Sequence, residues 1–466
     1  MSWNTFYNSI RNDLWPDCPT EDEFNNLPTE IKEECINTYG YRPKQYKEQS
    51  RLPHRIFPIQ TDTACQLKWN WSSIYLTTED TASCHRTNHH AFNTDTFDFH
   101  NTPEKIQDRE RMLRSEWPER GCEYCQNIEK TGGISDRITN LDLQGNHAPI
   151  EMDIDVNETR VTPRILEVYF DNTCNLKCLY CSPSFSSLWD AEVVKFGNFE
   201  KNGVIMGGKF AKSPNIQRNK QKLFEWLKVN GQHLTRMNIL GGEPLYQDEL
   251  IECLDFFDQY PAPDMELEFF SNLNVKKEKL VATVAQIKRL LDQGKIRKFN
   301  ITASIDCWGP QQEFVRYPLD LANWEKNFEY ILDQDYINII IGSTVTPLTV
   351  KTLPDLLDKF NSWYKRRPIY HYFNSVTTPT YFHIDILGNI FADDFKRILD
   401  LMPENTHEQK QVKEYMQGIA QQSASRDPNI PEVLKLQTFL DEMDRRRSTN
   451  WRTLFPWLDK EFKRLL

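Results

Sequence analysis

Short apolar runs alternate with longer amphipathic segments from about residue 160 to residue 400. Each run holds four to six residues rich in β-branched or aromatic side chains, which is typical of a strand buried in a parallel sheet. The predicted strands are Ile165–Phe170, Met237–Leu240, Leu267–Phe270, Asn300–Ser304, Ile337–Gly342 and Tyr381–Ile386.

The segments between these runs repeat their apolar residues with the 3.6-residue period of a helix. The predicted helices are Ser186–Phe196, Asn219–Val229, Asp248–Gln259, Lys277–Gln293, Leu321–Asp333 and Thr352–Lys365. Alternation of strands and helices with right-handed crossovers gives a parallel sheet that curls into all or part of a barrel. The pattern therefore predicts an α/β fold, a partial (β/α)6 TIM-like barrel with functional residues at the carboxyl ends of its strands.

The two ends of the chain lack this alternation. Residues 1–150 are rich in Asn, Thr, Asp and Pro, with one short predicted helix near Glu110–Glu116, so a metal is expected to help hold them together. Residues 143–163 are typical of a linker. Residues 401–466, including Asp441–Arg447, are charged with a helical pattern, which predicts a solvated helical cap. The predicted domains are 1–150, 160–400 and 401–466.

Composition narrows the class of protein. The chain has 56 basic and 67 acidic residues, a net charge of −11, and no long Lys/Arg run, which disfavours nucleic acid as a partner. It has no apolar stretch of membrane-spanning length and no signal-peptide pattern at its start, so a cytoplasmic protein without a membrane partner is expected. Its 11 cysteines cluster at metal-ligand spacings, apart from Cys18, Cys35, Cys253 and Cys307, and are interpreted as reduced thiols.

Three of these cysteines, Cys174, Cys178 and Cys181, follow the first predicted strand in a CxxxCxxC pattern. Iron–sulfur clusters are held by cysteine thiolates, usually four of them. Three thiolates leave one iron of a four-iron cluster without a protein ligand. An open iron can bind a small molecule, so this loop predicts a catalytic cluster.

A second motif, Gly241-Gly242-Glu243-Pro244, follows the second predicted strand. Its glycines let the backbone approach a ligand closely, and Glu243 can pair with an ammonium group. Alone, this motif is typical of a plain turn. Together with the three cysteines, it resembles the radical S-adenosylmethionine (radical SAM) enzymes. The resemblance implies a 4Fe-4S cluster whose open iron chelates the methionine end of S-adenosylmethionine (AdoMet), with the second motif binding its amino group.

The resemblance also assigns residues at later strand ends to AdoMet. Tyr180 matches an aromatic residue beside the adenine; packing under the cysteine loop is the alternative. Short polar side chains suit the ribose hydroxyls because they donate or accept at close range. The other cofactor-binding candidates are Ser271, Asn272, Ser304, Asp306 and Arg316, the last either binding the methionine carboxylate or pairing with Glu313.

Four further cysteines precede the barrel. Cys65 and Cys84 flank a predicted hairpin, Trp69 to Ser83, and Cys122 and Cys125 form a CxxC pair. Four thiolates suit either zinc or an iron–sulfur cluster, and His85, His89 and His90 are predicted not to be ligands. With Trp117, Asp136, Arg137 and Asn140, this segment resembles the auxiliary-cluster segment of twitch or SPASM-type radical SAM proteins, although no glycine precedes Cys84. The resemblance implies a second, auxiliary 4Fe-4S cluster.

These features predict an oxidoreductase-like radical SAM enzyme. The resemblance implies that a 5′-deoxyadenosyl radical removes hydrogen from a substrate, for oxidation, crosslinking or a related modification. A peptide substrate is favoured over a small molecule, and a flavodoxin or ferredoxin is expected as the reducing partner. Two alternatives stay open: a catalytically idle iron–sulfur or redox-sensing relative, and a sugar-type radical dehydrogenase.

Overall fold

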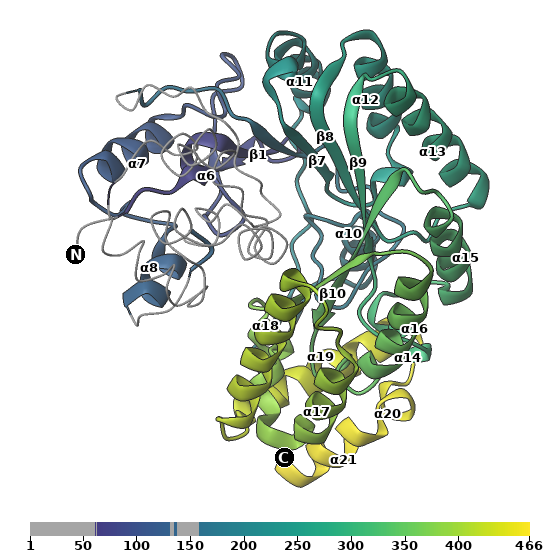
Figure 1. Ribbon diagram of the computed structural model, residues 1–466. Helices are drawn as coiled ribbons and strands as arrows, with labels where there is room; N and C mark the ends of the chain where they lie inside the picture. Colours follow the sequence, from purple (N-terminus) through teal and green to yellow (C-terminus); the bar gives the residue numbers. More distant parts are fainter. Residues whose placement is uncertain (1–60, 62, 131–134, 138–157) are drawn as a thin grey trace, which may run out of the picture. The chain divides into compact units, whose positions relative to one another are not determined.

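The computed structural model describes residues 61, 63–130, 135–137 and 158–466 (Figure 1). Several predicted features lie outside these residues: Cys18, Cys35, Asn140 and the first part of the linker. The described chain divides into two units. Unit 1 is drawn from Met1–Glu167, Gln221–Leu223 and His233–Thr235, and unit 2 is formed by Val168–Lys220, Phe224–Gln232 and Arg236–Leu466.

A parallel sheet forms the centre of unit 2. Its strands are β4 (Ile165–Tyr169, which begins in unit 1), β7 (Arg236–Leu240), β8 (Ala262–Ser271), β9 (Ile296–Ser304), β10 (Ile337–Val345) and β11 (Tyr370–Ser375). Their order, β4-β7-β8-β9-β10-β11, follows the chain, and the pairs from β7 to β11 are parallel. A mixed α/β fold is therefore confirmed, with the strand order expected of part of a barrel.

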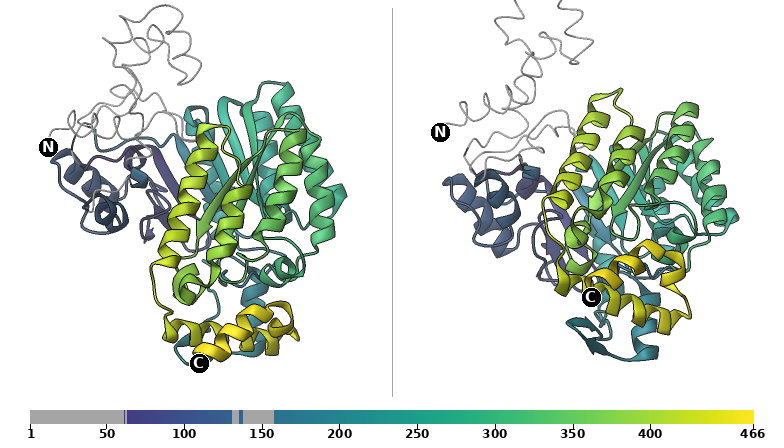
Figure 2. Two further views of the ribbon diagram at one scale, coloured as in Figure 1. Left: turned by 60° about the horizontal axis from the view of Figure 1, so that its bottom comes forward. Right: turned by 90° about the horizontal axis from the view of Figure 1, so that it is seen from below.

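Helices connect the strands, and the longer ones lie along one side of the sheet (Figures 1 and 2). They are α10 (Ser187–Phe196), α11 (Ile216–Asn230), α12 (Asp248–Gln259), α13 (Lys277–Asp292), α14 (Pro310–Val315), α15 (Leu321–Leu332) and α16 (Leu353–Arg366). All six predicted helices are present. Side-chain caps define two of their starts: the Ser186 hydroxyl accepts from the Trp189 N–H, and Asp320 accepts from the Asn323 N–H.

The sixth predicted strand is wrong. Tyr381–Ile386 forms two 3-10 segments, η3 (Thr380–Phe382) and η4 (Ile384–Phe391), and the sixth strand is β11 instead. β11 begins four residues after α16 ends and pairs with β10 from Ile340↔Tyr370 to Val345↔Ser375. The apolar alternation of Tyr381–Ile386 reflects burial against α19 (Ile430–Arg447), where Phe382 packs on Phe439.

Successive side chains of these strands point to opposite faces of the sheet, and the two faces differ in chemistry. Leu267, Phe269 and Ile301 are fully buried apolar residues. The alternate positions carry polar groups. The register places Asn238, Glu268 and Asn300 side by side on β7, β8 and β9. The Thr302 hydroxyl donates to Glu268 at 2.7 Å. A strand buried on both faces is normally apolar throughout, so this polar row distinguishes one face of the sheet.

The last helices belong to unit 2 (Figure 2). They are α17 (Ala392–Leu401), α18 (His407–Ala424), α19 (Ile430–Arg447), α20 (Trp451–Leu454) and α21 (Pro456–Leu465). The prediction of helices is confirmed, but a solvated cap is wrong for α19. That helix buries Leu436, Phe439 and Met443, and Trp451 after it is completely buried. The high charge of this helix led to the prediction of a solvated surface, but several of its charged side chains are themselves buried.

Unit 1 contains the elements α6 (Gln66–Asn70), β1 (Trp71–Tyr75), β2 (Asp80–Ala82), β3 (His90–Ala91), α7 (Pro103–Leu113) and α8 (Glu123–Lys130). β1 and β2 form the predicted hairpin, with Ser73 opposite Ala82. Its connection has Glu79 at φ 60°, a conformation that favours glycine. The predicted helix near residues 110–116 is the end of the longer α7. The unit has a core of its own around Trp69 and Met112.

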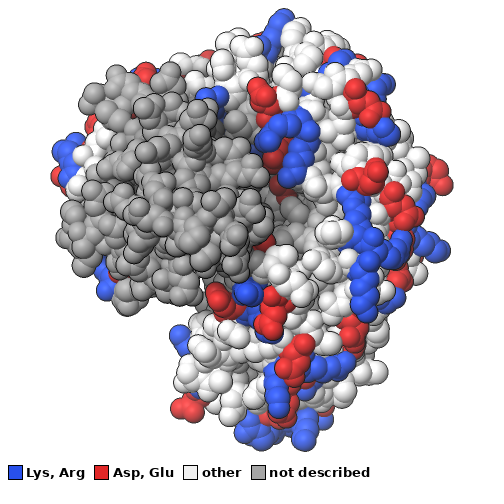
Figure 3. All heavy atoms as spheres, viewed as in Figure 1, with Lys and Arg blue, Asp and Glu red and all other residues white. Residues whose placement is uncertain are grey.

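Charged side chains and helix hydropathy can be followed over the part of the chain that the structure describes. On the face shown in Figure 3, positive and negative side chains are interspersed over the outer helices of unit 2. Within the described ranges, the helices are all too short or too polar to cross a bilayer.

Candidate functional site

The loop between β4 and α10 brings Cys174, Cys178 and Cys181 together. The Cys181 N–H donates to the Cys178 carbonyl at 3.0 Å, and the Leu176 N–H donates to Cys174 Sγ at 3.4 Å. Burial, together with the charge of Cys178, raises the pKa of Cys181 to about 12. Three thiols that oppose one another's ionisation are a donor set for a cation, because a bound metal offsets the repulsion between thiolates. These residues fit an iron–sulfur cluster.

The backbone of this loop is fixed on both sides of Cys178. The Lys177 N–H donates to the Tyr317 carbonyl at 2.7 Å, and the Leu179 N–H donates to the Val315 carbonyl at 2.9 Å. Indole Nε1 of Trp189 donates to the Cys178 carbonyl at 2.7 Å. Burial raises the pKa of Cys178, whereas the guanidinium groups of Arg316 and Arg447 lower it. The loop is therefore held in one conformation, with two cations near its central cysteine.

The Gly-Gly-Glu-Pro motif follows β7 and packs directly on the cysteine loop. Gly241 and Gly242 have φ values of 86° and 55°, which glycine adopts without strain. A methyl group on Gly242 would lie 2.1 Å from the Thr173 carbonyl oxygen, and the Glu243 N–H donates to that same oxygen at 2.9 Å. Only glycine allows this approach, so the two motifs form one structural unit.

Replacing Gly242 with alanine is expected to displace this motif, at a cost of about 3 kcal/mol or more, and to abolish AdoMet binding. Equilibrium dialysis with labelled AdoMet tests this. Gly197→Ala is the matched control, because Gly197 has φ 77° but open space around the added methyl group. Equal AdoMet affinity in both variants would contradict the expected clash.

Glu243 joins the second motif to the end of β8. Its buried carboxylate accepts from the Ser271 hydroxyl at 2.7 Å, the Asn272 N–H at 2.6 Å and the Leu245 N–H at 3.1 Å. Asn272 Nδ2 in turn lies 3.9 Å from Cys174 Sγ and donates to Asn175. The structure thus brings together four predicted site residues from three strand ends. Pro244 begins a short 3-10 turn after Glu243.

The ionisation of Glu243 gives a test by pH. Burial raises its pKa to about 7, against the lowering effect of the three hydrogen bonds. A protonated Glu243 must lose its proton before it can pair with an ammonium. AdoMet affinity is therefore expected to rise as pH increases from about 6 to 8, by up to about tenfold per unit below the pKa. Calorimetric titration at several pH values measures this, and Glu243→Gln should bind more weakly with a flat profile. A pH-independent Kd in the unsubstituted protein would rule out this role.

Asp306, Arg316 and Tyr180 form a closed group beyond β9. Completely buried Asp306 accepts from Tyr180 Oη at 2.5 Å, from Arg316 at 2.7 and 2.8 Å, and from the Thr344 N–H at 2.9 Å. Arg316 also lies over the Tyr180 ring, at 5.7 Å from its centroid. Since Asp306 and Arg316 satisfy each other, their arrangement orients Tyr180; direct contact of either with AdoMet stays a prediction. Glu313 accepts from the Leu321 N–H rather than pairing with Arg316.

Ser304 ends β9 and is partly exposed. The register places it opposite Gly342 on β10. Its role as a ribose ligand stays a prediction.

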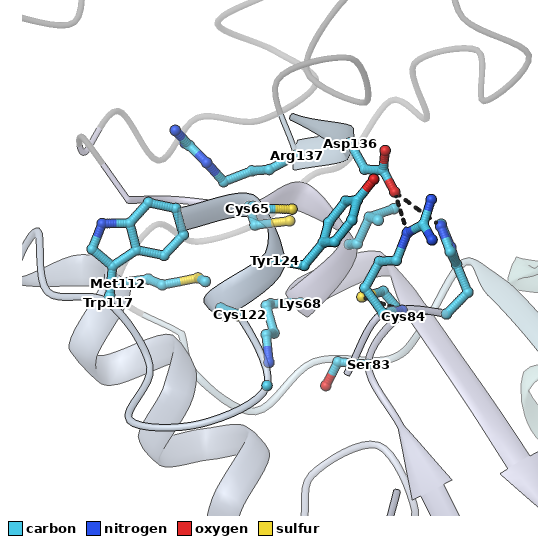
Figure 4. A pocket seen from close by; sticks show the side chains of 15 residues that line it. Cys65, Lys68, Ser83, Cys84, Met112, Trp117, Cys122, Tyr124, Asp136 and Arg137 are labelled. Carbon is cyan, nitrogen blue, oxygen red and sulfur yellow. Dashed lines mark hydrogen bonds and ion pairs between the residues drawn. The ribbon is translucent and has the colours of Figure 1, made fainter. Parts of the chain in front are cut away.

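The four cysteines of unit 1 line one pocket of about 440 Å³, counting the part open to solvent. Figure 4 shows Cys65, Cys84 and Cys122 around this pocket, with Trp117 and Met112 forming part of its wall. Cys65 comes from the start of α6, Cys84 from the end of the hairpin, and Cys122 and Cys125 from the start of α8. Three segments, separated by up to 60 residues along the chain, thus place four thiols about one space.

Charged side chains surround this pocket. Buried Lys68 pairs with Asp108 at 2.5 Å, and buried Arg137 pairs with Glu129 at 2.5 Å. Burial raises the pKa of Cys122 to about 11; Lys68 lowers it and Cys84 raises it. Such buried cations stabilise thiolates, so the surroundings fit a cysteine-ligated metal group.

The histidines near Cys84 have other contacts. His85 lies 3.2 Å from Asp136 at the rim of the pocket, His89 stacks on Tyr75, and His90 lies 2.9 Å from the Thr102 hydroxyl. Within the part of the chain that the structure describes, no three His, Cys, Asp or Glu side chains are arranged to hold a single metal ion.

Sequence reasoning missed several residues beside the cysteine loop, above all Trp189, Glu192 and Arg447. No local motif marks them. Arg447 is 255 residues from Glu192, its ion-pair partner, and lies in a run of three arginines that reads as a solvated surface.

Comparisons with known proteins find structures of low sequence identity that match only part of the chain. No family model and no curated protein matches the chain. Three similar solved structures are of anSMEcpe: one with bound AdoMet (TM-score 0.31, 16% identity), one with AdoMet and the Kp18Cys peptide (0.32, 16%), and one with AdoMet and the Cp18Cys peptide (0.31, 17%). The matches cover 50%, 51% and 51% of this chain, and 57%, 59% and 58% of those chains, respectively.

Proposed function

We propose that this protein is a radical SAM enzyme built on a partial barrel, with one auxiliary cluster. The observation that carries the proposal is the packing of Gly242 and Glu243 on the loop that holds the three cysteines. Both motifs follow strands of one parallel sheet, where such folds place their active residues. The organisation into residues 1–150, 160–400 and 401–466 is part of this proposal.

The chain's own residues would bind and orient the cofactors. Cys174, Cys178 and Cys181 would hold the 4Fe-4S cluster, and Glu243 would accept the AdoMet ammonium. Tyr180, oriented by Asp306, would lie beside the adenine ring. When bound, the cluster would supply the electron that cleaves AdoMet into methionine and a 5′-deoxyadenosyl radical. The surrounding sheet would keep solvent from that radical.

The four cysteines of unit 1 would hold the auxiliary 4Fe-4S cluster. All four cysteines line one pocket, and its walls carry Lys68 and Arg137. A cluster with four thiolate ligands carries net negative charge, which these buried cations would offset. Zinc on the same cysteines is the alternative, and sulfide analysis separates the two.

A peptide is the favoured substrate class, with a small sugar-type molecule as the alternative. The polar row of Asn238, Glu268 and Asn300 supports a polar substrate, because carboxamide and carboxylate groups pair with amide or hydroxyl groups of a ligand. The expected reducing partner is a flavodoxin or a ferredoxin.

The direct test is AdoMet cleavage. The full chain, reconstituted with iron and sulfide without oxygen and reduced with dithionite, should hold roughly eight iron atoms and release 5′-deoxyadenosine. Liquid chromatography with mass spectrometry detects the product. A fully loaded protein that binds AdoMet but never cleaves it, with dithionite or with a reduced flavodoxin, would instead indicate a catalytically idle relative.

A further inference from the structure

A buried ion triad connects the last long helix with the cysteine loop. Glu192 on α10 accepts from Arg447 at 3.1 Å through both Nε and Nη2, and it also pairs with Lys177 of the loop. The side chains of Arg447 and Glu192 are 1% and 0% exposed. Two cations and one carboxylate leave this triad with an excess positive charge in a buried place.

Arg447 also contacts the two aromatic residues that hold the loop backbone. Its guanidinium carbon lies 5.0 Å from the Trp189 ring centroid and 5.4 Å from that of Tyr317. Trp189 donates to the Cys178 carbonyl, and the Tyr317 carbonyl accepts from the Lys177 N–H. Arg447 therefore supports both anchors of the segment that ends in Cys178.

The second cation near Cys178 does not share this excess charge. Arg316 pairs through two hydrogen bonds with Asp306, so the two charges cancel. In contrast, Arg447 Nη1 has no hydrogen-bond partner within the described residues. A buried guanidinium that keeps an unused donor, in a triad with excess positive charge, costs free energy unless a negative group lies nearby. A cluster held by thiolates is such a group.

We propose that Arg447 is a positioning residue of the catalytic site, and that the Glu192–Arg447–Lys177 triad raises the reduction potential of the cluster on the cysteine loop. This inference rests on the proposed function. Reduction adds one negative charge to the cluster, and a nearby net positive charge stabilises the reduced form. The helical segment after residue 400 is then part of the site, not a peripheral cap.

The fixed charge predicts opposite effects for two substitutions. Arg447→Met removes the excess positive charge and should lower the ratio of reduced to oxidised cluster at a fixed solution potential by about tenfold, equivalent to 59 mV. Glu192→Gln increases the excess positive charge and should raise that ratio. Arg447→Lys keeps the charge and should restore most of the potential while losing the paired hydrogen bonds.

The measurement is a redox titration of the reconstituted full chain followed by electron paramagnetic resonance. Addition of AdoMet identifies the cluster on the cysteine loop, because only that cluster should change its signal. Arg445→Met is the matched control, since Arg445 neighbours Arg447 but its side chain is 57% exposed. A midpoint unchanged in both Arg447→Met and Glu192→Gln, or shifted in the same direction in both, would overturn the proposal.

Loss of cluster from Arg447→Met does not prevent the test. The shift in Glu192→Gln still decides the sign of the effect, and a lowered midpoint there overturns the proposal. Failure of the proposed function gives a different result, because the unsubstituted protein would then lack any cluster whose signal responds to AdoMet.

Discussion

Replacing Cys178 with alanine is expected to abolish 5′-deoxyadenosine formation and to remove about half of the bound iron, roughly four of eight atoms per chain. The substitution leaves two of the three thiolates that are proposed to hold the cluster. Cys178 is also the cysteine whose backbone carbonyl accepts a hydrogen bond from Trp189, which fixes its place in the loop. Product analysis and iron and sulfide assays on the reconstituted chain measure both effects.

Cys253→Ala is the control for this substitution. Cys253 is a completely buried thiol on α12, outside both sets of proposed ligands. Its replacement should cost stability but leave iron content and turnover near those of the unsubstituted protein. Continued AdoMet cleavage by Cys178→Ala would show that another group completes the cluster, and would end the assignment of this loop.

The second large effect is expected in unit 1. A chain in which both Cys65 and Cys122 are replaced by alanine should lose the auxiliary cluster and unfold unit 1 at lower temperature. Metal binding couples directly to the folding of small domains, and Cys65 is part of this unit's core. Without thiolates, Lys68 and Arg137 would keep only Asp108 and Glu129 as negative neighbours. The expected iron loss is again about four atoms, now with the AdoMet-responsive signal retained.

Iron and sulfide analysis with a thermal melt tests this prediction, and His85→Ala is the matched control. His85 lines the same pocket but pairs with Asp136 and is predicted not to be a ligand. It should therefore keep full iron content. If the analysis finds zinc rather than iron and sulfide in unit 1 of the unsubstituted protein, the proposal of an auxiliary cluster is wrong and the cysteines form a structural zinc site.

The local features of the parallel sheet and its helices were predictable from sequence. Five of its six strands and all six of its predicted helices follow from apolar periodicity, because each buries one face against its immediate neighbours. The positions of the cysteine loop and of Gly241–Pro244 after β4 and β7 follow for the same reason. The sixth strand could not be predicted, since the aromatic alternation of Tyr370–Ser375 and the apolar alternation of Tyr381–Ile386 satisfy the same pattern.

By itself, the sequence determined which residues could hold metal and which strand ends would carry them, because ligand spacing and strand periodicity are local. Only the tertiary structure decided how those residues are supported. Asp306 turned out to satisfy Arg316 and orient Tyr180, and Arg447 turned out to be buried against Glu192. Whether a charged side chain is solvated or buried depends on the partner that the fold brings to it from far along the chain. The local sequence does not indicate which residue that partner is.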